Sequence, residues 1–124
     1  MAKRKKKTVR CVEYLSVNGS IERVNALENN QRRYIREYVR YKEYQVTKTL
    51  RRNGLSMKSI DYHWELIVNL IREGKVDGVV IANMAVVSNS LSDAYRKVGQ
   101  IVEAGGIVVT VDEGRLEMKI KESA

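Results

Sequence analysis

Few side chains in this sequence have the types and spacing that catalysis or metal binding would need. The chain has one cysteine, Cys11, and one histidine, His63, which excludes sites built from several thiolates or imidazoles. We expect Cys11 to be a buried apolar residue and His63 to be a packed or surface residue. Asp112 and Glu113 are the only acids paired in a predicted strand-end loop, where acid-base catalysis would use two carboxylates. The turn around Gly19 offers one glycine, whereas a phosphate-binding fingerprint needs several. These residues therefore predict no cofactor and no metal.

Basic charge is concentrated in two segments of the 124-residue chain, whose formal net charge is +8. Residues 1–10 carry six basic side chains and no acid, and residues 32–52 carry eight basic side chains against two acids. The rest of the chain is net acidic. A protein polarised in this way is expected to contact a polyanion such as DNA. The predicted DNA-contact residues are Lys3, Arg4, Lys5, Lys6, Lys7, Arg51 and Arg52.

Length and composition are those of one globular domain preceded by a short arm. With 44% hydrophobic and 31% charged residues, the chain can bury a core of its own. We expect residues 1–8 to form a flexible basic arm and residues 9–124 to form a single domain. No apolar run approaches the roughly 18 residues of a membrane span, and no signal peptide follows the basic start. The sequence therefore predicts a cytoplasmic protein with no membrane contact.

The hydrophobic pattern predicts strands and helices in alternation. Strands are predicted over residues 8–17, 44–50, 76–82 and 107–111, and a half-exposed edge strand over 116–120. Helices are predicted over residues 26–43, 60–73 and 91–104. This order predicts a three-layer α/β sandwich with flavodoxin-like topology. Its sheet is mostly parallel, with helices on both faces and an antiparallel edge strand.

Two helices carry further signals in their side chains. Ser90 and Asp93 have the spacing of a capping box at the start of the third helix, and Gly74 is a stop signal for the second. The tyrosines of the first helix are interpreted as core and boundary residues. Its apolar stripe is Leu27, Tyr34, Ile35, Tyr38, Val39 and Tyr41.

The loops after the strands are the expected place for a functional site. In open parallel sheets, ligands bind beyond the carboxyl ends of the strands, where the strand order reverses. The loops concerned are 16–20, 51–59, 83–89 and 112–114.

Several segments resemble, in order and spacing, the catalytic domain of the serine recombinases, the resolvase and invertase family. The resemblance covers roughly residues 9–114 and implies a resolvase-like α/β fold. It also implies an activity in which a serine attacks a DNA phosphodiester that arginines hold. The matching segments are Tyr14-Leu15-Ser16-Val17-Asn18, residues 27–35, Gly54-Leu55-Ser56 with Lys58-Ser59, residues 71–80 and residues 88–93.

The resemblance also places the catalytic positions of the family on this sequence. The position of the serine nucleophile holds Asn18, and that of the nearby phosphate-binding arginine holds Ser16. The arginine motif before the third helix falls on Ala85, Val86 and Asn89. An amide cannot form the covalent intermediate, and phosphoryl transfer depends on cations at the phosphate. We therefore expect a degenerate, non-catalytic recombinase-like module, a pseudoenzyme.

The function of such a module has alternatives. The preferred hypothesis is a regulatory or oligomerising protein linked to DNA recombination, which contacts DNA through its basic arm and pairs with itself or with an active recombinase. One alternative is an active strand-transfer recombinase in which Ser16 or Ser20 has become the nucleophile. Another is an unrelated α/β ligand-binding domain. Arginines converging on Ser16, Asn18 and Ser20 would favour the enzyme.

Overall fold

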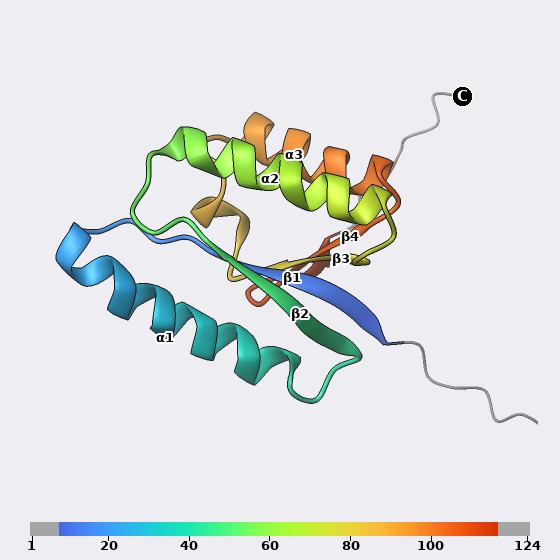
Figure 1. Ribbon diagram of the computed structural model, residues 1–124, viewed down its shortest axis with the longest axis horizontal. Helices are drawn as coiled ribbons and strands as arrows, with labels where there is room; N and C mark the ends of the chain where they lie inside the picture. Colours follow the sequence, from blue (N-terminus) through green and yellow to red (C-terminus); the bar gives the residue numbers. More distant parts are fainter. Residues whose placement is uncertain (1–7, 117–124) are drawn as a thin grey trace, which may run out of the picture.

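In the computed structural model, which describes residues 8–116, a five-stranded sheet lies between layers of helices (Figure 1). The strands are β1 (Val9–Leu15), β2 (Tyr44–Arg51), β3 (Gly78–Ile81), β4 (Ile107–Thr110) and β5 (Gly114–Leu116). They lie in the order β2-β1-β3-β4-β5, with the first four parallel and β5 antiparallel to β4. The predicted mostly parallel sheet with an antiparallel strand at its edge is confirmed, although β5 begins at Gly114, before the predicted start at residue 116.

Helices cover both faces of the sheet, as the sequence predicts. The helices are α1 (Ile21–Val39), α2 (Met57–Arg72) and α3 (Leu91–Glu103), with a short 3₁₀ helix, η1, over Met84–Val86. α1 covers one face, and α2 and α3 cover the other (Figure 1). α1 begins earlier than the predicted residue 26 and ends earlier than residue 43, because residues 40–43 form the turn into β2.

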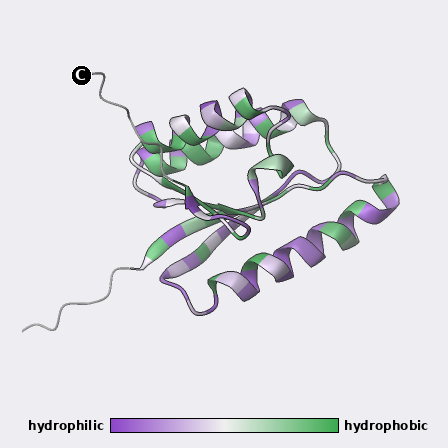
Figure 2. Cartoon of the chain, turned by 180° about the vertical axis from the view of Figure 1, so that it is seen from behind, coloured by the Kyte–Doolittle hydropathy of each residue, from purple (hydrophilic) through white to green (hydrophobic). Residues whose placement is uncertain are grey.

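Alternation along β1 divides the core between the two faces of the sheet. Cys11 and Leu15 pack on the side of α1, and Val12 and Tyr14 pack on the side of α2 and α3. Successive side chains of a strand point to opposite faces, so both sides of β1 are buried. The core under α2 and α3 is the larger one and includes Trp64. α1 is mostly hydrophilic, as Figure 2 shows by its purple colour.

The alternation of β2 shifts at a bulge. Cys11 of β1 pairs with Val46, but the next residue of β1 pairs with Lys48, so Thr47 is an extra residue in the ladder. Val46 therefore packs in the core beside α1, whereas Leu50 packs in the core beneath α2 and α3. The predicted second strand is confirmed, but its apolar residues do not share one face.

The apolar stripe predicted on α1 is only partly buried. Ile35 is in the core, whereas the side chains of Tyr34 and Tyr41 are 49% and 86% exposed. The expectation that these two tyrosines belong to the core or its boundary is wrong. Glu28 and Gln31 are buried instead, because both make hydrogen bonds to the backbone of neighbouring loops.

The predicted stop signal at Gly74 is confirmed, whereas only the N-cap half of the predicted capping box forms, because the Asp93 carboxylate binds Arg96 and Lys97. Ser90 Oγ accepts a hydrogen bond from Asp93 N at 3.1 Å at the start of α3. Gly74, after α2, has a φ of +74°, which favours glycine. β3 begins with Gly78, where a Cβ atom would lie 2.4 Å from Ile107 O of β4. This contact requires glycine at the start of β3.

Two predictions fall wholly or largely on residues that the structure does not describe. The basic arm over residues 1–8 is described only at Thr8, and the edge strand over 116–120 only at Leu116. The bounds of the arm and of the domain therefore stay predictions. Within residues 8–116, no helix is long and apolar enough to cross a membrane.

Candidate functional site

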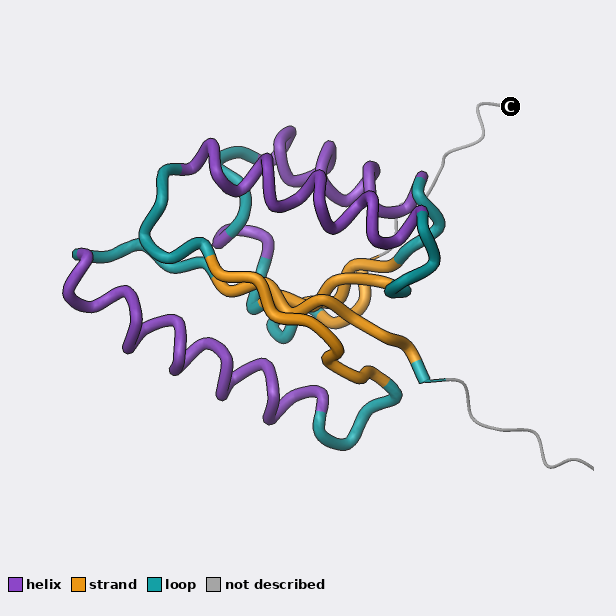
Figure 3. The backbone as a smooth tube through the Cα atoms, viewed as in Figure 1, coloured by secondary structure: helices purple, strands orange, loops and turns teal. Residues whose placement is uncertain are grey.

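The carboxyl ends of the parallel strands gather at one edge of the sheet. The order of the strands reverses between β1 and β3, which makes the loops after them the switch point of the sheet. Figure 3 shows the loops after β1 and β2 running beside each other, and Arg52 N donates to Leu15 O at 2.9 Å. The polar side chains that meet at this edge come from Ser16, Asn18, Gln31 and Arg52.

Ser16 is completely buried at the end of β1, and its polar atoms are hydrogen-bonded. Ser16 Oγ donates to Val86 O at 2.6 Å, across the switch point. Gln31 of α1 accepts from Ser16 N at 2.8 Å and donates to Ser16 O at 2.9 Å. A hydroxyl whose proton points at a carbonyl oxygen has no path to a general base. In this geometry Ser16 ties β1 to η1 and to α1.

Arg52 follows β2 and converges on the same place. Its Nη1 lies 3.1 Å from Asn18 Oδ1, 3.3 Å from Val17 O and 3.4 Å from Ser16 Oγ. Its Nε donates to Leu55 O at 2.7 Å, and the residue is only 9% exposed. The motif resemblance left no arginine beside Ser16 and Asn18, yet the fold brings one there. The sequence predicted Arg52 to contact DNA, whereas the structure directs most of its guanidinium inward.

Arg51, the last residue of β2, is paired with residues of α1. Arg51 Nη2 donates to Asn29 Oδ1 at 3.2 Å, and Nη1 lies 3.6 Å from Oε1 of the fully buried Glu28. Glu28 Oε2 accepts from Asn53 N at 3.0 Å. Glu28 Oε1 and Arg51 Nη1 are both buried and make no hydrogen bond to a described group, so their ion pair is what offsets their burial. These contacts hold the loop after β2 in place. That Arg51 contacts DNA stays a prediction.

The other positions that the resemblance relates to catalysis lie in the loops after β1 and β3. Asn18, Ala85 and Asn89 are exposed, and Val86 is half-buried. Ser20, the alternative nucleophile, is exposed at the start of α1 and its side chain makes no capping hydrogen bond. The catalytic positions assigned to these residues stay predictions.

A second polar cluster lies after β4. Asp112 accepts hydrogen bonds from Tyr34 Oη and, at 2.8 Å, from Asn83 Nδ2. These bonds, that of Tyr34 above all, hold the pKa of Asp112 below its ordinary value. Glu113 lies in the turn, where its backbone N donates to Thr110 Oγ1 at 2.9 Å. An ionised Asp112 that already accepts two hydrogen bonds is a poor general acid.

Cys11 and His63 are packed residues, which confirms the sequence prediction. Cys11 is fully buried, and burial raises the pKa of its thiol to about 12. His63 Nδ1 lies 2.8 Å from Tyr14 Oη, and burial lowers the pKa of His63. Both side chains are therefore held in their neutral forms near neutral pH.

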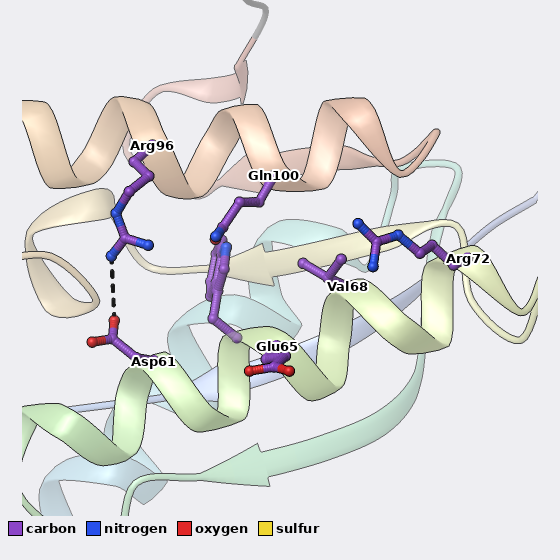
Figure 4. A pocket seen from close by; sticks show the side chains of 7 residues that line it. Asp61, Glu65, Val68, Arg72, Arg96 and Gln100 are labelled. Carbon is purple, nitrogen blue, oxygen red and sulfur yellow. Dashed lines mark ion pairs between the residues drawn. The ribbon is translucent and has the colours of Figure 1, made fainter.

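A groove of about 350 Å³ between α2 and α3 is a second candidate site (Figure 4). Asp61, Glu65 and Arg72 line it from α2, and Arg96 and Gln100 line it from α3. Asp61 Oδ1 and Arg96 Nη2 are 3.6 Å apart. Two acids and two arginines cancel in charge, so the groove favours no charged ligand. It therefore gives the ligand-binding alternative no specific ligand.

Lys97 is a nearly fully buried lysine that forms two ion pairs between α2 and α3. Its Nζ lies 2.8 Å from Asp61 Oδ1 and 2.8 Å from Asp93 Oδ2, and its side chain is 2% exposed. The hydrogen bond from Lys97 is the main cause that lowers the pKa of Asp93. Lys97 thus joins α2 to α3 and offers no free positive charge. Among residues 8–116, no cluster of histidine, cysteine and acidic side chains is placed to hold a metal ion.

Sequence reasoning missed the contacts of Arg52 and Gln31 with Ser16. A signal for Arg52 was present, since neighbouring parallel strands end at the same edge and the residues after them meet. No signal marked Gln31 or Glu28 as buried, because periodicity assigns polar residues of a helix to its exposed faces.

Comparison with solved structures identifies the fold. A resolvase family site-specific recombinase from Streptococcus pneumoniae superposes with a TM-score of 0.70 at 16% identity, covering 86% of this chain and 74% of the other. The N-terminal catalytic domain of TP901-1 integrase gives 0.70 at 17% identity, covering 85% and 79%. The C-terminal catalytic domain of ISC1926 TnpA, an IS607-like serine recombinase, gives 0.65 at 20% identity, covering 83% and 70%. No protein-family model and no curated protein matches the sequence. The chain therefore has the fold of serine recombinase catalytic domains, as its motifs implied.

Proposed function

We propose that this chain is a serine-recombinase-like module that associates with DNA and does not cleave it. The observation that carries the proposal is the state of Arg52. It is the arginine that reaches Ser16 and Asn18, and its guanidinium is occupied by oxygens of the protein itself. The solved structures with this fold are named as recombinases or as an integrase catalytic domain, which supports DNA as the partner.

The chemistry of strand transfer requires a nucleophile and cations that hold the phosphate. Asn18, at the position of the nucleophile, carries an amide that cannot attack phosphorus. Ser16 directs its hydroxyl proton to Val86 O. Removing one electrostatic donor typically lowers a catalysed rate by about 10²–10³. A site that lacks the nucleophile and several cations is therefore expected to be inactive.

The partners of the module follow from charge and from exposed apolar surface. The arm residues Lys3, Arg4, Lys5, Lys6 and Lys7 supply a dense positive charge for the phosphates of DNA. Leu91 and Tyr95 of α3 are 73% and 60% exposed and line an apolar hollow of about 280 Å³. Such a surface suits self-association or pairing with an active recombinase. We propose that the protein acts in the cytoplasm.

One observation favours an active enzyme as the second candidate. Arg52 Nη1 lies within 3.4 Å of Ser16 Oγ, and Ser20 is exposed with no capping hydrogen bond at the start of α1. Ser16 could act as the nucleophile only if DNA binding moved the loop after β1 and broke the hydrogen bond from Ser16 to Val86 O. Ser20 would need a second cation beside Arg52, since one arginine is a poor match for the charge that develops on the phosphate.

The experiment that separates the two candidates is a search for covalent protein–DNA adducts. The full chain is incubated with supercoiled plasmids carrying random genomic fragments, denatured, and assayed for protein-linked DNA by gel shift and mass spectrometry. We expect no adduct and no nicked plasmid. An adduct that Ser16→Ala or Ser20→Ala abolishes would establish the active enzyme and overturn the proposal.

DNA association is tested separately by the salt dependence of binding. Deleting residues 2–7 removes five basic side chains. Each phosphate contact contributes about 0.9 to the slope of log affinity against log salt, so the slope is expected to flatten by several units. Unchanged affinity and slope after the deletion would exclude the arm as a DNA contact.

A further inference from the structure

The outer surface of α1 holds a groove whose lining is almost entirely arginine. It has a volume of about 450 Å³ and is lined by Asn29, Arg32, Arg33 and Arg36. These residues have spacings of three, four and seven along the helix, which places them on one face. The side chains of Arg32 and Arg36 are 46% and 42% exposed. No function described above uses this surface.

A buried carboxylate orients two of these arginines. Glu13 of β1 is fully buried, and its Oε2 accepts from Arg36 Nε at 3.0 Å while its Oε1 accepts from Arg36 Nη2 at 3.2 Å. Arg32 Nε lies 3.8 Å from Glu13 Oε1, and Thr49 Oγ1 donates to the same oxygen at 2.9 Å. A guanidinium held in this way loses less conformational entropy when it binds a ligand. Glu13 thus keeps the groove ordered.

The groove keeps an excess of positive charge after this pairing. Three guanidinium groups face one carboxylate, and Arg33 makes no ion pair with any residue in the described part of the chain. Asn29 Oδ1 accepts from Arg51, which leaves its amide group as a further donor. The groove therefore presents hydrogen-bond donors and positive charge, which favour the binding of an anion.

The shape of the surface indicates a linear polyanion. At 1.5 Å per residue, Asn29 and Arg36 are separated by roughly 10 Å along the helix axis. One strand of duplex DNA carries a phosphate for about every 3.4 Å of its axis, so a stripe of this length that lies along the axis spans about three phosphates. The hydrogen bond from Arg51 to Asn29 also joins the groove to the loop after β2, at the edge that contains Ser16 and Arg52.

We propose that this α1 arginine groove binds the phosphate backbone of duplex DNA, independently of the arm. The inference rests on the proposed association with DNA but assigns a second contact, in the folded domain. Arg33 and Arg32 bind phosphate directly, and Arg36 adds a donor while Glu13 positions it. The contact is to the backbone and carries no sequence preference.

The test measures binding of a 30-base-pair duplex by the full chain and by the chain without residues 2–7. Each is compared with its Arg32→Gln/Arg33→Gln variant, and with Arg23→Gln as the control. Arg23 is an exposed arginine of the same helix outside the groove. Loss of two phosphate contacts is expected to lower the salt slope by about 1.8 in both backgrounds. Between about 50 and 200 mM salt, the affinity of the variant should then fall about 12-fold less than that of its parent. Arg23→Gln should leave the slope unchanged.

The outcomes distinguish this inference from the proposed function. If the arm deletion flattens the salt slope and the double variant does not, the proposed association with DNA stands and the proposed DNA contact of the groove is overturned. If the double variant acts only in the intact chain, the groove is not an independent contact and the inference fails. If Arg32→Gln/Arg33→Gln weakens binding to phosphatidylserine vesicles but not to DNA, the groove is a membrane contact and the inference is also overturned. Urea unfolding of the double variant should remain a single cooperative transition, because Arg36 still pairs with Glu13, and this shows that the fold is intact.

Discussion

The role of Arg52 distinguishes a structural site from a phosphate-binding site at the carboxyl ends of the strands. Its guanidinium makes four hydrogen bonds to protein oxygens, the shortest at 2.7 Å to Leu55 O and 3.1 Å to Asn18 Oδ1. A hydrogen bond from a charged group contributes about 1.5–3 kcal/mol. Arg52→Met keeps the stem and removes these donors. Counting only the two shortest bonds, the free energy of unfolding should fall by about 3 kcal/mol.

Chemical and thermal unfolding measure this loss. For a domain of this size, a change of about 3 kcal/mol corresponds to a fall in Tm of roughly 10 °C. Arg23→Met, on an exposed part of α1, should change the free energy of unfolding by less than about 0.5 kcal/mol. Arg52→Lys should recover only part of the loss, since one ammonium cannot reproduce the fork that joins Leu55 O to Asn18 Oδ1.

The same variant tests the function of the site. If Arg52 is structural, Arg52→Met should leave the salt slope of DNA binding unchanged at a temperature where the variant is folded. A loss of stability below about 1 kcal/mol, together with a fall in the salt slope of about 1, would contradict a structural role of Arg52. Arg52 would then be a phosphate ligand and the enzymatic alternative would gain support.

Three further predictions concern packing, pH and assembly. Gly78→Ala places a Cβ atom 2.4 Å from Ile107 O, so the free energy of unfolding measured in urea should fall by about 1–3 kcal/mol. Because burial raises the pKa of Cys11 from 9.0 to about 12, its thiol should react with Ellman's reagent at pH 8 only in urea. The stability linked to this thiol should be complete below pH 9 and decline above it, as the unfolded chain ionises first. Light scattering should show self-association that Leu91→Glu and Tyr95→Glu weaken, and a clean monomer of the parent at high concentration would contradict this.

Much of the fold could be predicted because its signals are local. The apolar run of β3 and the N-cap signal of Ser90 and Asp93 each lie in a short window of sequence. The alternation of strands and helices along the chain then leaves few possible topologies. The bulge at Thr47 could not be predicted, because it depends on how β2 pairs with β1. The hydrogen bond from Tyr34 to Asp112 could not be predicted either, because the two residues lie far apart in the chain.

Residue type and periodicity alone establish the order of strands and helices, the small number of residues able to do chemistry, and the places where basic charge is dense. Which of these charges are free depends on contacts between distant parts of the fold. The tertiary structure buries Arg52 against Ser16 and Asn18, and it places Glu13 beneath the arginines of α1. The reason is physical, since the effect of a charge depends on the groups within a few ångströms of it, and in this fold those groups come from distant segments of the chain.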